Sequence, residues 1–221
     1  PIGWLWNHMS NLTGFGTLCA SKLMGLSAYG KYNEYFYNIF ETIFDGEITE
    51  KKQKHFKHID LEKHGIEDLA YTLQQFTMDK IKEFVYPLKT SENLCVAGGV
   101  SYNGYMNEEF TKTWTNVYVP PAVGDEGQAL GVYQHADYTL NENKHISETF
   151  AGKDYNFVGD EKVNIKEIAQ SIADGKIVGW FQGKSESGNR ALGNRCILAD
   201  PRNPDIKDII NDTIKDREDF R

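Results

Sequence analysis

A pattern in the middle of the chain, repeated once, limits the possible folds more than any other feature of the sequence. A short apolar run at 94–97 leads into a glycine pair at 98–99, and the helix-forming residues 103–113 follow. The same order then returns, with an apolar run at 117–119 and a glycine-rich turn that opens a helix over 124–138. Alternating strands and helices of this kind are typical of an α/β fold, in which we expect the first run to be a buried strand.

The clearest helix is expected just before this pattern, from Ile66 to Tyr86. Pro87 ends it, because proline lacks an amide hydrogen and clashes with a preceding helical turn. The apolar residues recur near the i, i+3, i+4, i+7 spacing of an amphipathic helix, which predicts that they form one buried face. That face comprises Ile66, Leu69, Ala70, Leu73, Phe76, Ile81, Phe84 and Val85.

The segment 139–163 contains few apolar residues and several Asn, Glu and Lys, which indicates a domain boundary. We therefore predict two domains, 1–150 and 151–221. The charged segment 47–64 is interpreted as a surface connection. The other expected elements are helices within 4–9, 32–44, 165–173 and 206–214, a strand at 176–181 and a glycine- and serine-rich loop at 183–193.

The two glycine turns are the first candidates for chemistry. Gly98 and Gly99 would let the backbone approach a ligand closely, and the amides that begin the next helix would favour an anion. The alternative is a tight turn without a ligand. Asp125, between Gly124 and Gly127, lies where α/β folds place metal or phosphate chemistry. Its alternative role is that of a helix N-cap.

A third candidate is the basic loop that contains Lys184, Arg190 and Arg195 in an otherwise acidic protein. Guanidinium groups can bind phosphate oxygens with two parallel hydrogen bonds. Surface charge pairing is the alternative. Lys215 and Arg217, with Arg221 after them, are either a second wall of the same pocket or cations at the end of a helix.

Charge and composition exclude several classes of function. A net charge of −8 argues against a general nucleic-acid-binding or membrane-surface role. No segment approaches the ~20 apolar residues of a membrane span. Cys19, Cys95 and Cys196 are widely spaced, which predicts free, buried thiols in a reducing compartment such as the cytoplasm.

Three histidines, His55, His58 and His64, occur within ten residues of one another. Their spacing does not fit a single helix face and the surrounding sequence is hydrophilic. We therefore interpret them as solvated side chains and not as metal ligands.

The ordered set of blocks resembles the carbamoyltransferase family that includes the nodulation-factor and the cephamycin, novobiocin and tobramycin O-carbamoyltransferases. A final block is similar to the K-x-R-E-x-F-R segment of that family. Together the blocks span nearly the whole chain, and their common order is far more specific than any single block. They are Lys22–Gly30, Ala97–Asn103, Gly124–Gly131, Gly179–Arg202 and Lys215–Arg221.

The resemblance implies an architecture and a reaction. The architecture is the C-terminal part of an actin-like (ribonuclease H-like) ATPase domain followed by the start of a carbamoyl-adenylate-forming α/β domain. Carbamoyl phosphate and ATP would give carbamoyl-adenylate, and the actin-like domain would pass the carbamoyl group to a hydroxyl of a small molecule or sugar. The task of the protein would be to position the reactants and to neutralise phosphate charge.

Roles for individual residues follow from the same resemblance. Gly98, Gly99 and Asn103 would line the nucleotide, ATP with Mg(II), and Lys22 would lie near its phosphate. Asp125 would be one ligand of a catalytic Fe(II).

In the second domain, Arg190, Arg195, Lys215 and Arg217 would hold carbamoyl phosphate and ATP. The implied partners are carbamoyl phosphate and a hydroxyl-bearing small molecule, with no nucleic acid and no membrane. A homodimer is left open.

The sequence also departs from the family pattern. The N-terminal histidines of the family's metal site and the first half of its actin-like domain have no counterpart here, so we expect the chain to be a piece of a longer protein. The family's Gly-Pro-Arg reads Gly188-Asn189-Arg190, which keeps the arginine. Two rival functions stay open: a catalytically inactive nucleotide-binding module, and an actin-superfamily kinase, which would have no use for the segment 179–221.

Overall fold

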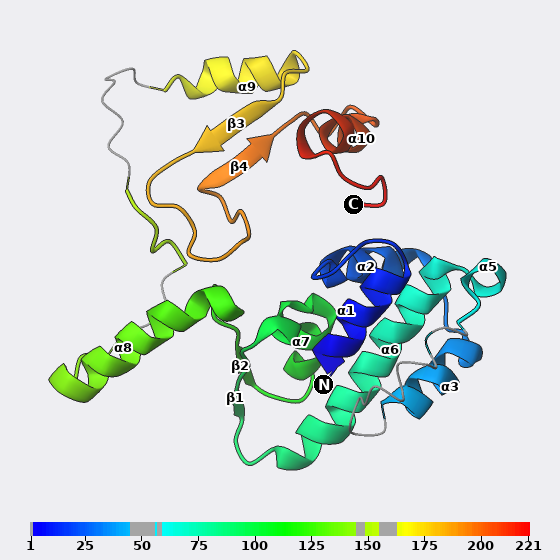
Figure 1. The fold of residues 1–221 in the computed structure, drawn as a ribbon. Coiled ribbons are helices and arrows are strands. Elements are labelled where there is room, and N and C mark those ends of the chain that lie inside the picture. Colours follow the sequence, from blue (N-terminus) through cyan, green and yellow to red (C-terminus); the bar gives the residue numbers. More distant parts are fainter. Residues whose placement is uncertain (1, 45–55, 57–58, 145–148, 155–162) are drawn as a thin grey trace. The chain divides into compact units, whose positions relative to one another are not determined.

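The computed structural model describes residues 2–44, 56, 59–144, 149–154 and 163–221 (Figure 1). Among them, none of the helices is both long and apolar enough to cross a membrane. In chain order the helices and strands are α1 (Ile2–Leu12), α2 (Ala20–Leu26), α3 (Glu34–Ile43), α5 (Leu61–His64), α6 (Ile66–Val85), β1 (Asn93–Cys95), α7 (Gly104–Thr111), β2 (Asn116–Tyr118), α8 (Gln128–Asn141), α9 (Ile165–Ala173), β3 (Val178–Phe181), β4 (Arg195–Leu198) and α10 (Ile206–Ile210), with one π-helical turn (Asn211–Lys215) after it.

The chain forms two compact units. The first comprises residues 1–94, 103–117 and 220–221, and the second comprises residues 95–102 and 118–219. Helices and strands are mixed throughout, which confirms an α/β composition in this coarse sense. The domain division at about residue 150 stays a prediction.

The first unit is built around α6, which packs against α2 and α3 (Figure 1). The Phe76 ring is fully buried and its centroid lies 5.4 to 5.6 Å from the rings of Tyr37, Phe40 and Phe44. The Trp6 indole of α1 donates a hydrogen bond of 2.8 Å to Thr77 Oγ1. Residues from α1, α3 and α6, far apart in the sequence, thus share one core.

The predicted helix at 66–86 is confirmed, and it ends at Val85, just before Pro87. The prediction of its buried face is wrong for one residue, because the Phe84 side chain is 72% exposed. The ion pair between Lys80 and Glu41 of α3 lies one turn before Phe84. The last turn of α6 therefore extends past the helix that covers its apolar face.

The predicted buried strand at 94–97 is only partly confirmed. Residues 93–95 form β1, which pairs with β2 in a two-stranded sheet, but Cys95 and Ala97 are exposed and Leu94 is half-buried. A strand is fully buried only when both faces of its sheet are covered. The exposure of Cys95 and Ala97 shows that the β1–β2 sheet is not covered on both faces.

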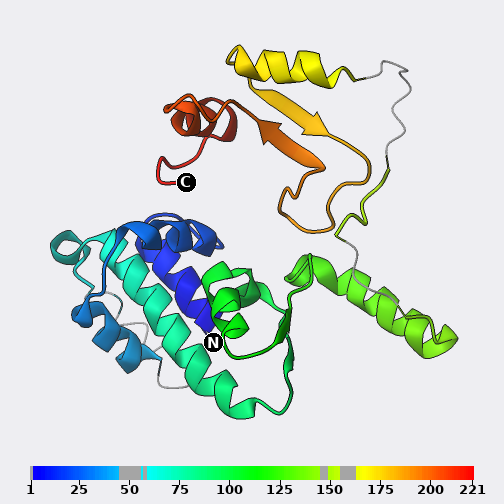
Figure 2. The ribbon, with the colours of Figure 1, turned by 180° about the vertical axis from the view of Figure 1, so that it is seen from behind.

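The second unit contains an antiparallel pair, β3 and β4, whose strands lie side by side in both views (Figures 1 and 2). The register pairs Val178 with Leu198 and Phe181 with Arg195. The sequence predicted β3 and the helices on either side of the pair but not β4. β4 has only four residues, which carry little strand signal of their own. It forms a strand because it pairs with β3.

Two predictions about single residue types need correction. The three cysteines are free thiols, as expected, but Cys95 is exposed and the other two are half-buried. His64 is not a solvated side chain, because it stacks on Tyr35 with ring centroids 4.2 Å apart and its Nδ1 lies 3.3 Å from Asn33 Nδ2. His55 and His58 lie outside the described residues.

Candidate functional site

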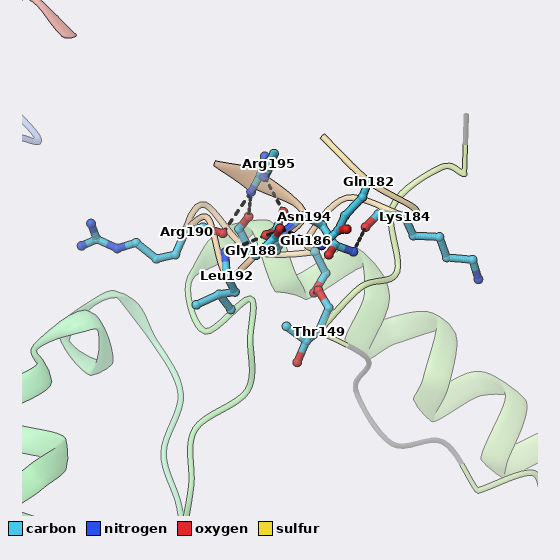
Figure 3. A network of polar contacts seen from close by, with 11 residues as sticks. Thr149, Gln182, Lys184, Glu186, Gly188, Arg190, Leu192, Asn194 and Arg195 are labelled. Carbon is cyan, nitrogen blue, oxygen red and sulfur yellow. Dashed lines mark hydrogen bonds and ion pairs between the residues drawn. The ribbon is translucent and has the colours of Figure 1, made fainter. Parts of the chain in front are cut away.

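The loop between β3 and β4 is organised around one buried carboxylate. The side chain of Glu186 has no exposed surface. Its Oε1 accepts hydrogen bonds from the amides of Leu192 (2.6 Å) and Asn194 (3.0 Å), and its Oε2 accepts one of 2.9 Å from Arg195 Nε (Figure 3). Both carboxylate oxygens are therefore used inside the loop.

These contacts stabilise the ionised form of Glu186. Burial by itself raises the pKa of this carboxyl, but the amides of Leu192, Glu186 itself and Asn194, together with the Arg195 side chain, lower the pKa to about 2. The ordinary value is 4.5, so the ionised form is favoured by folding. Its contribution to stability is complete above the ordinary pKa and is lost as the pH falls toward 2.

Arg195 also acts within the loop. Its Nη2 donates to the carbonyl oxygen of Gly188 and, at 3.4 Å, to that of Arg190 (Figure 3). The guanidinium that the sequence assigned to the nucleotide thus links Glu186 to two carbonyls of the same loop. Whether it also contacts a nucleotide stays a prediction.

Unlike Arg195, Lys184 and Arg190 do not direct their side chains into the loop. Their side chains extend away from the hydrogen-bond network, on opposite sides of the loop (Figure 3). Among the described residues the guanidinium of Arg190 has no hydrogen-bond or ion-pair partner. The Lys184 carbonyl accepts a hydrogen bond of 2.7 Å from Asn194 Nδ2. The backbone of the loop is fixed while these two cations face outward on opposite sides (Figure 3), so each could contact a separate anion.

The first glycine turn and Asp125 border one pocket of about 450 Å³ in the second unit. The Gly98 amide donates a hydrogen bond of 2.8 Å to Val123 O, and its φ of +99° lies in the region that favours glycine. Ser187 of the β3–β4 loop lines the same pocket. A Cβ at Gly188 would lie 2.1 Å from Pro121 O, so only glycine lets the loop approach the pocket wall.

Asp125 is exposed at this pocket, and its Oδ1 accepts a hydrogen bond of 3.2 Å from Gln128 Nε2. The alternative N-cap role is wrong, because Gly124 and Gly127 occupy the N-cap positions of the 3₁₀ turn and of α8. Within the described part of the chain, no three His, Cys, Asp or Glu side chains lie close enough to share a metal ion. Asp125 and its described neighbours therefore do not make a metal site by themselves.

Asn103, predicted to line the nucleotide, lies in the first unit and is buried. Its Oδ1 caps α7 by accepting from the Met106 amide at 3.2 Å, and its amide group exchanges hydrogen bonds of 2.8 and 3.3 Å with Gln74 of α6. In this structure the side chain joins two helices.

Replacing Asn103 with Ala is expected to destabilise the protein by about 2 kcal/mol, because a cap is lost and the buried Gln74 amide loses its partner. Urea unfolding followed by circular dichroism would measure this change. Asn164→Ala is the matched control, since Asn164 caps the exposed helix α9 through the Lys166 and Glu167 amides and its only other described side-chain contact is with the exposed Glu167 carboxylate. Equal losses in both variants would contradict a role for the Gln74 pair, and a loss of nucleotide affinity without destabilisation would support the original prediction.

The structure also describes three other predicted residues: Lys22, Gly99 and Lys215. Lys22 lies half-buried in α2 of the first unit, and Gly99 begins a 3₁₀ turn over Gly99–Tyr102. Lys215 is exposed at the end of the π-helical turn.

Arg217 Nε donates a hydrogen bond of 2.7 Å to Oδ1 of Asn211, which is fully buried. Sequence reasoning missed both Asn211 and Glu186 as supporting residues. A single polar residue in a loop or turn carries no periodic signal that would reveal its burial.

Comparison with known proteins identifies one family in two separate parts of the chain. A family model described as the carbamoyltransferase N-terminus matches residues 1–133, and one described as the carbamoyltransferase C-terminus matches residues 169–221.

Three curated relatives illustrate the similarity. Nodulation protein NolNO of Sinorhizobium fredii is 28% identical over the whole chain, which covers 38% of that protein. Nodulation protein NolO of Bradyrhizobium diazoefficiens is 30% identical over 94% of the chain and 45% of its own length. The 3'-hydroxymethylcephem-O-carbamoyltransferase of Streptomyces clavuligerus is 35% identical over 58% of the chain and 26% of its own length. The chain thus spans less than half the length of each.

Proposed function

This chain belongs to the carbamoyltransferase family, and from that premise we propose that it forms part of an ATP-dependent O-carbamoyltransferase. The single observation that carries the proposal, beyond family membership, is the β3–β4 loop. Its backbone is fixed by Glu186 and Arg195, and Arg190 extends outward from it. A cation that extends from a fixed backbone is suited to a phosphorylated substrate.

The proposed reaction has two stages. In the first, carbamoyl phosphate, water and ATP give carbamoyl-adenylate, with loss of phosphate from carbamoyl phosphate and of pyrophosphate from ATP. In the second, a hydroxyl of a small molecule or sugar attacks the carbamoyl carbon, and AMP leaves. The protein supplies little covalent chemistry in this scheme, so its main tasks are to orient the phosphates and to offset their charge.

We assign Arg190, Lys215 and Arg217 to the binding of carbamoyl phosphate and ATP. Arg190 and Lys215 are exposed, and Arg217 is oriented by its hydrogen bond to Asn211. Arg195 is assigned to the support of the loop because of its contacts with Glu186 and Gly188.

The pocket beside Gly98 and Asp125 is proposed to receive part of the nucleotide or the carbamoyl group. Its volume of about 450 Å³ lies within the range of small-molecule sites. The open turn at Gly98 and Gly99 allows a ligand to approach the backbone, since a Cβ at either position would meet no atom within 4 Å. Lys22 and Asn103 remain proposed nucleotide contacts, and an actin-like fold for this half of the protein remains part of the proposal.

The two implied metal ions, Mg(II) and Fe(II), differ in the ligands that they would need from the protein. Mg(II) would accompany ATP through the phosphates. Fe(II) would need ligands in addition to Asp125, and the described residues do not gather any beside it. No step of the proposed reaction is therefore assigned to iron.

Pyrophosphate release from ATP, measured on the full-length protein, tests the proposal. Release that requires carbamoyl phosphate is the expected result, since neither a kinase nor an inactive nucleotide-binding module would show that requirement. Omitting carbamoyl phosphate, and replacing it with acetyl phosphate, are the controls. A folded protein that binds ATP but releases no pyrophosphate would contradict the proposal and favour an inactive nucleotide-binding module.

A further inference from the structure

The buried carboxylate of Glu186 accepts hydrogen bonds from two backbone amides of a glycine-rich loop. Backbone amides in a glycine-rich loop often converge on a phosphate. Here the amides of Leu192 and Asn194 converge instead on Glu186 Oε1, at 2.6 and 3.0 Å (Figure 3). These donors are already occupied by a side chain from within the loop.

The same carboxylate fixes the direction of Arg195. Glu186 Oε2 accepts from Arg195 Nε, and the Nη2 of that guanidinium reaches the carbonyls of Gly188 and Arg190. The chain of contacts thus runs from the buried carboxylate through Arg195 to the backbone of Arg190. Further contacts close the base of the loop, where the Gln182 amide donates to Asn194 O at 3.0 Å and Gln182 Nε2 donates to Gly193 O at 3.2 Å.

We infer that Glu186 is a positioning residue, which acts through Arg195 to fix the loop backbone from which the Arg190 side chain extends toward carbamoyl phosphate. This inference rests on the proposed function. It assigns the phosphate to the outward side chain of Arg190 and not to the loop amides. Losing the contact between the carboxylate and Arg195 would free that guanidinium, so the backbone of Arg190 would sample more positions and its side chain would bind the substrate less often.

The sharpest variant is Glu186→Gln. Its amide oxygen can still accept from Leu192 and Asn194, but its NH₂ group would face the Nε–H of Arg195, so donor would meet donor. We expect the KM for carbamoyl phosphate in pyrophosphate release to rise about tenfold to a hundredfold, the range of one hydrogen bond between charged groups, with a smaller change in kcat. Glu167→Gln is the matched control: Glu167 is exposed on α9, and its contact with Asn164 Nδ2 survives in Gln.

A double-mutant cycle separates positioning from general structural damage. If Glu186 acts through Arg190, Glu186→Gln should change kcat/KM by less than about twofold in an Arg190→Ala background, because the group it positions is gone. An equal loss in both backgrounds would overturn the inference. So would an unchanged KM for Glu186→Gln in an active protein.

Two further measurements keep the inference testable. Should Glu186→Gln fail to fold, Arg195→Lys keeps a cation beside Glu186 but loses the bridge to the Gly188 and Arg190 carbonyls, and it should raise the same KM; an unchanged KM would overturn the inference. Should the unaltered protein release no pyrophosphate, the proposed reaction fails. Calorimetric affinity for carbamoyl phosphate in the same variants would then decide the role of Glu186, and no binding by the unaltered protein would overturn both.

Discussion

Replacing Arg190 with Ala is expected to lower kcat/KM for carbamoyl phosphate by about 10²–10³-fold, the loss typical of removing one preorganised donor from a reacting oxyanion. The physical reason is that Arg190 is an outward-facing guanidinium on a loop whose backbone is already fixed. In the proposed site, its loss leaves the phosphate charge with one cation fewer. Carbamoyl phosphate-dependent pyrophosphate release at varied substrate concentration measures the effect.

Two variants make this result specific. Arg190→Lys keeps the charge but loses the two-pronged donor geometry, so it should recover only part of the activity. Arg202→Ala is the matched control, because Arg202 is already paired with Asp200 through Nε at 2.9 Å and lies outside the loop. Similar losses for Arg190→Ala and Arg202→Ala would indicate a general effect of positive charge and would contradict a specific contact.

The largest effect on stability is expected for Phe76→Ala, which should lower the free energy of unfolding by about 3–5 kcal/mol. The ring is fully buried among Tyr37, Phe40 and Phe44, so its removal loses the transfer free energy of the ring and leaves a cavity. Guanidinium unfolding followed by circular dichroism gives the measurement. Since the core belongs to the first unit, the transition of that unit is the one to follow.

Phe84→Ala provides the matched control on the same helix. Phe84 is 72% exposed, and its truncation should change stability by no more than about 0.5 kcal/mol. The pair compares one residue type on one helix in two environments. Equal losses would mean that Phe84 is covered in solution by another part of the protein.

The sequence by itself determined the order and type of most elements. The 3.6-residue periodicity of α6, the proline that ends it and the glycine turns before α7 and α8 are local properties, because each depends on residues within a few positions of one another. The ordered blocks also indicated the carbamoyltransferase family, which the matches to the family models confirm.

Only the tertiary structure decided which residues these elements bury and where the predicted site residues point. Phe76 and Phe84 fit the same helical pattern, but only Phe76 lies beneath α3. Asn103 is engaged by Gln74, 29 positions earlier, and Arg195 by Glu186 across a loop. Burial and hydrogen bonding depend on partners that are distant in sequence, and no local pattern encodes which partner the folded chain will bring near.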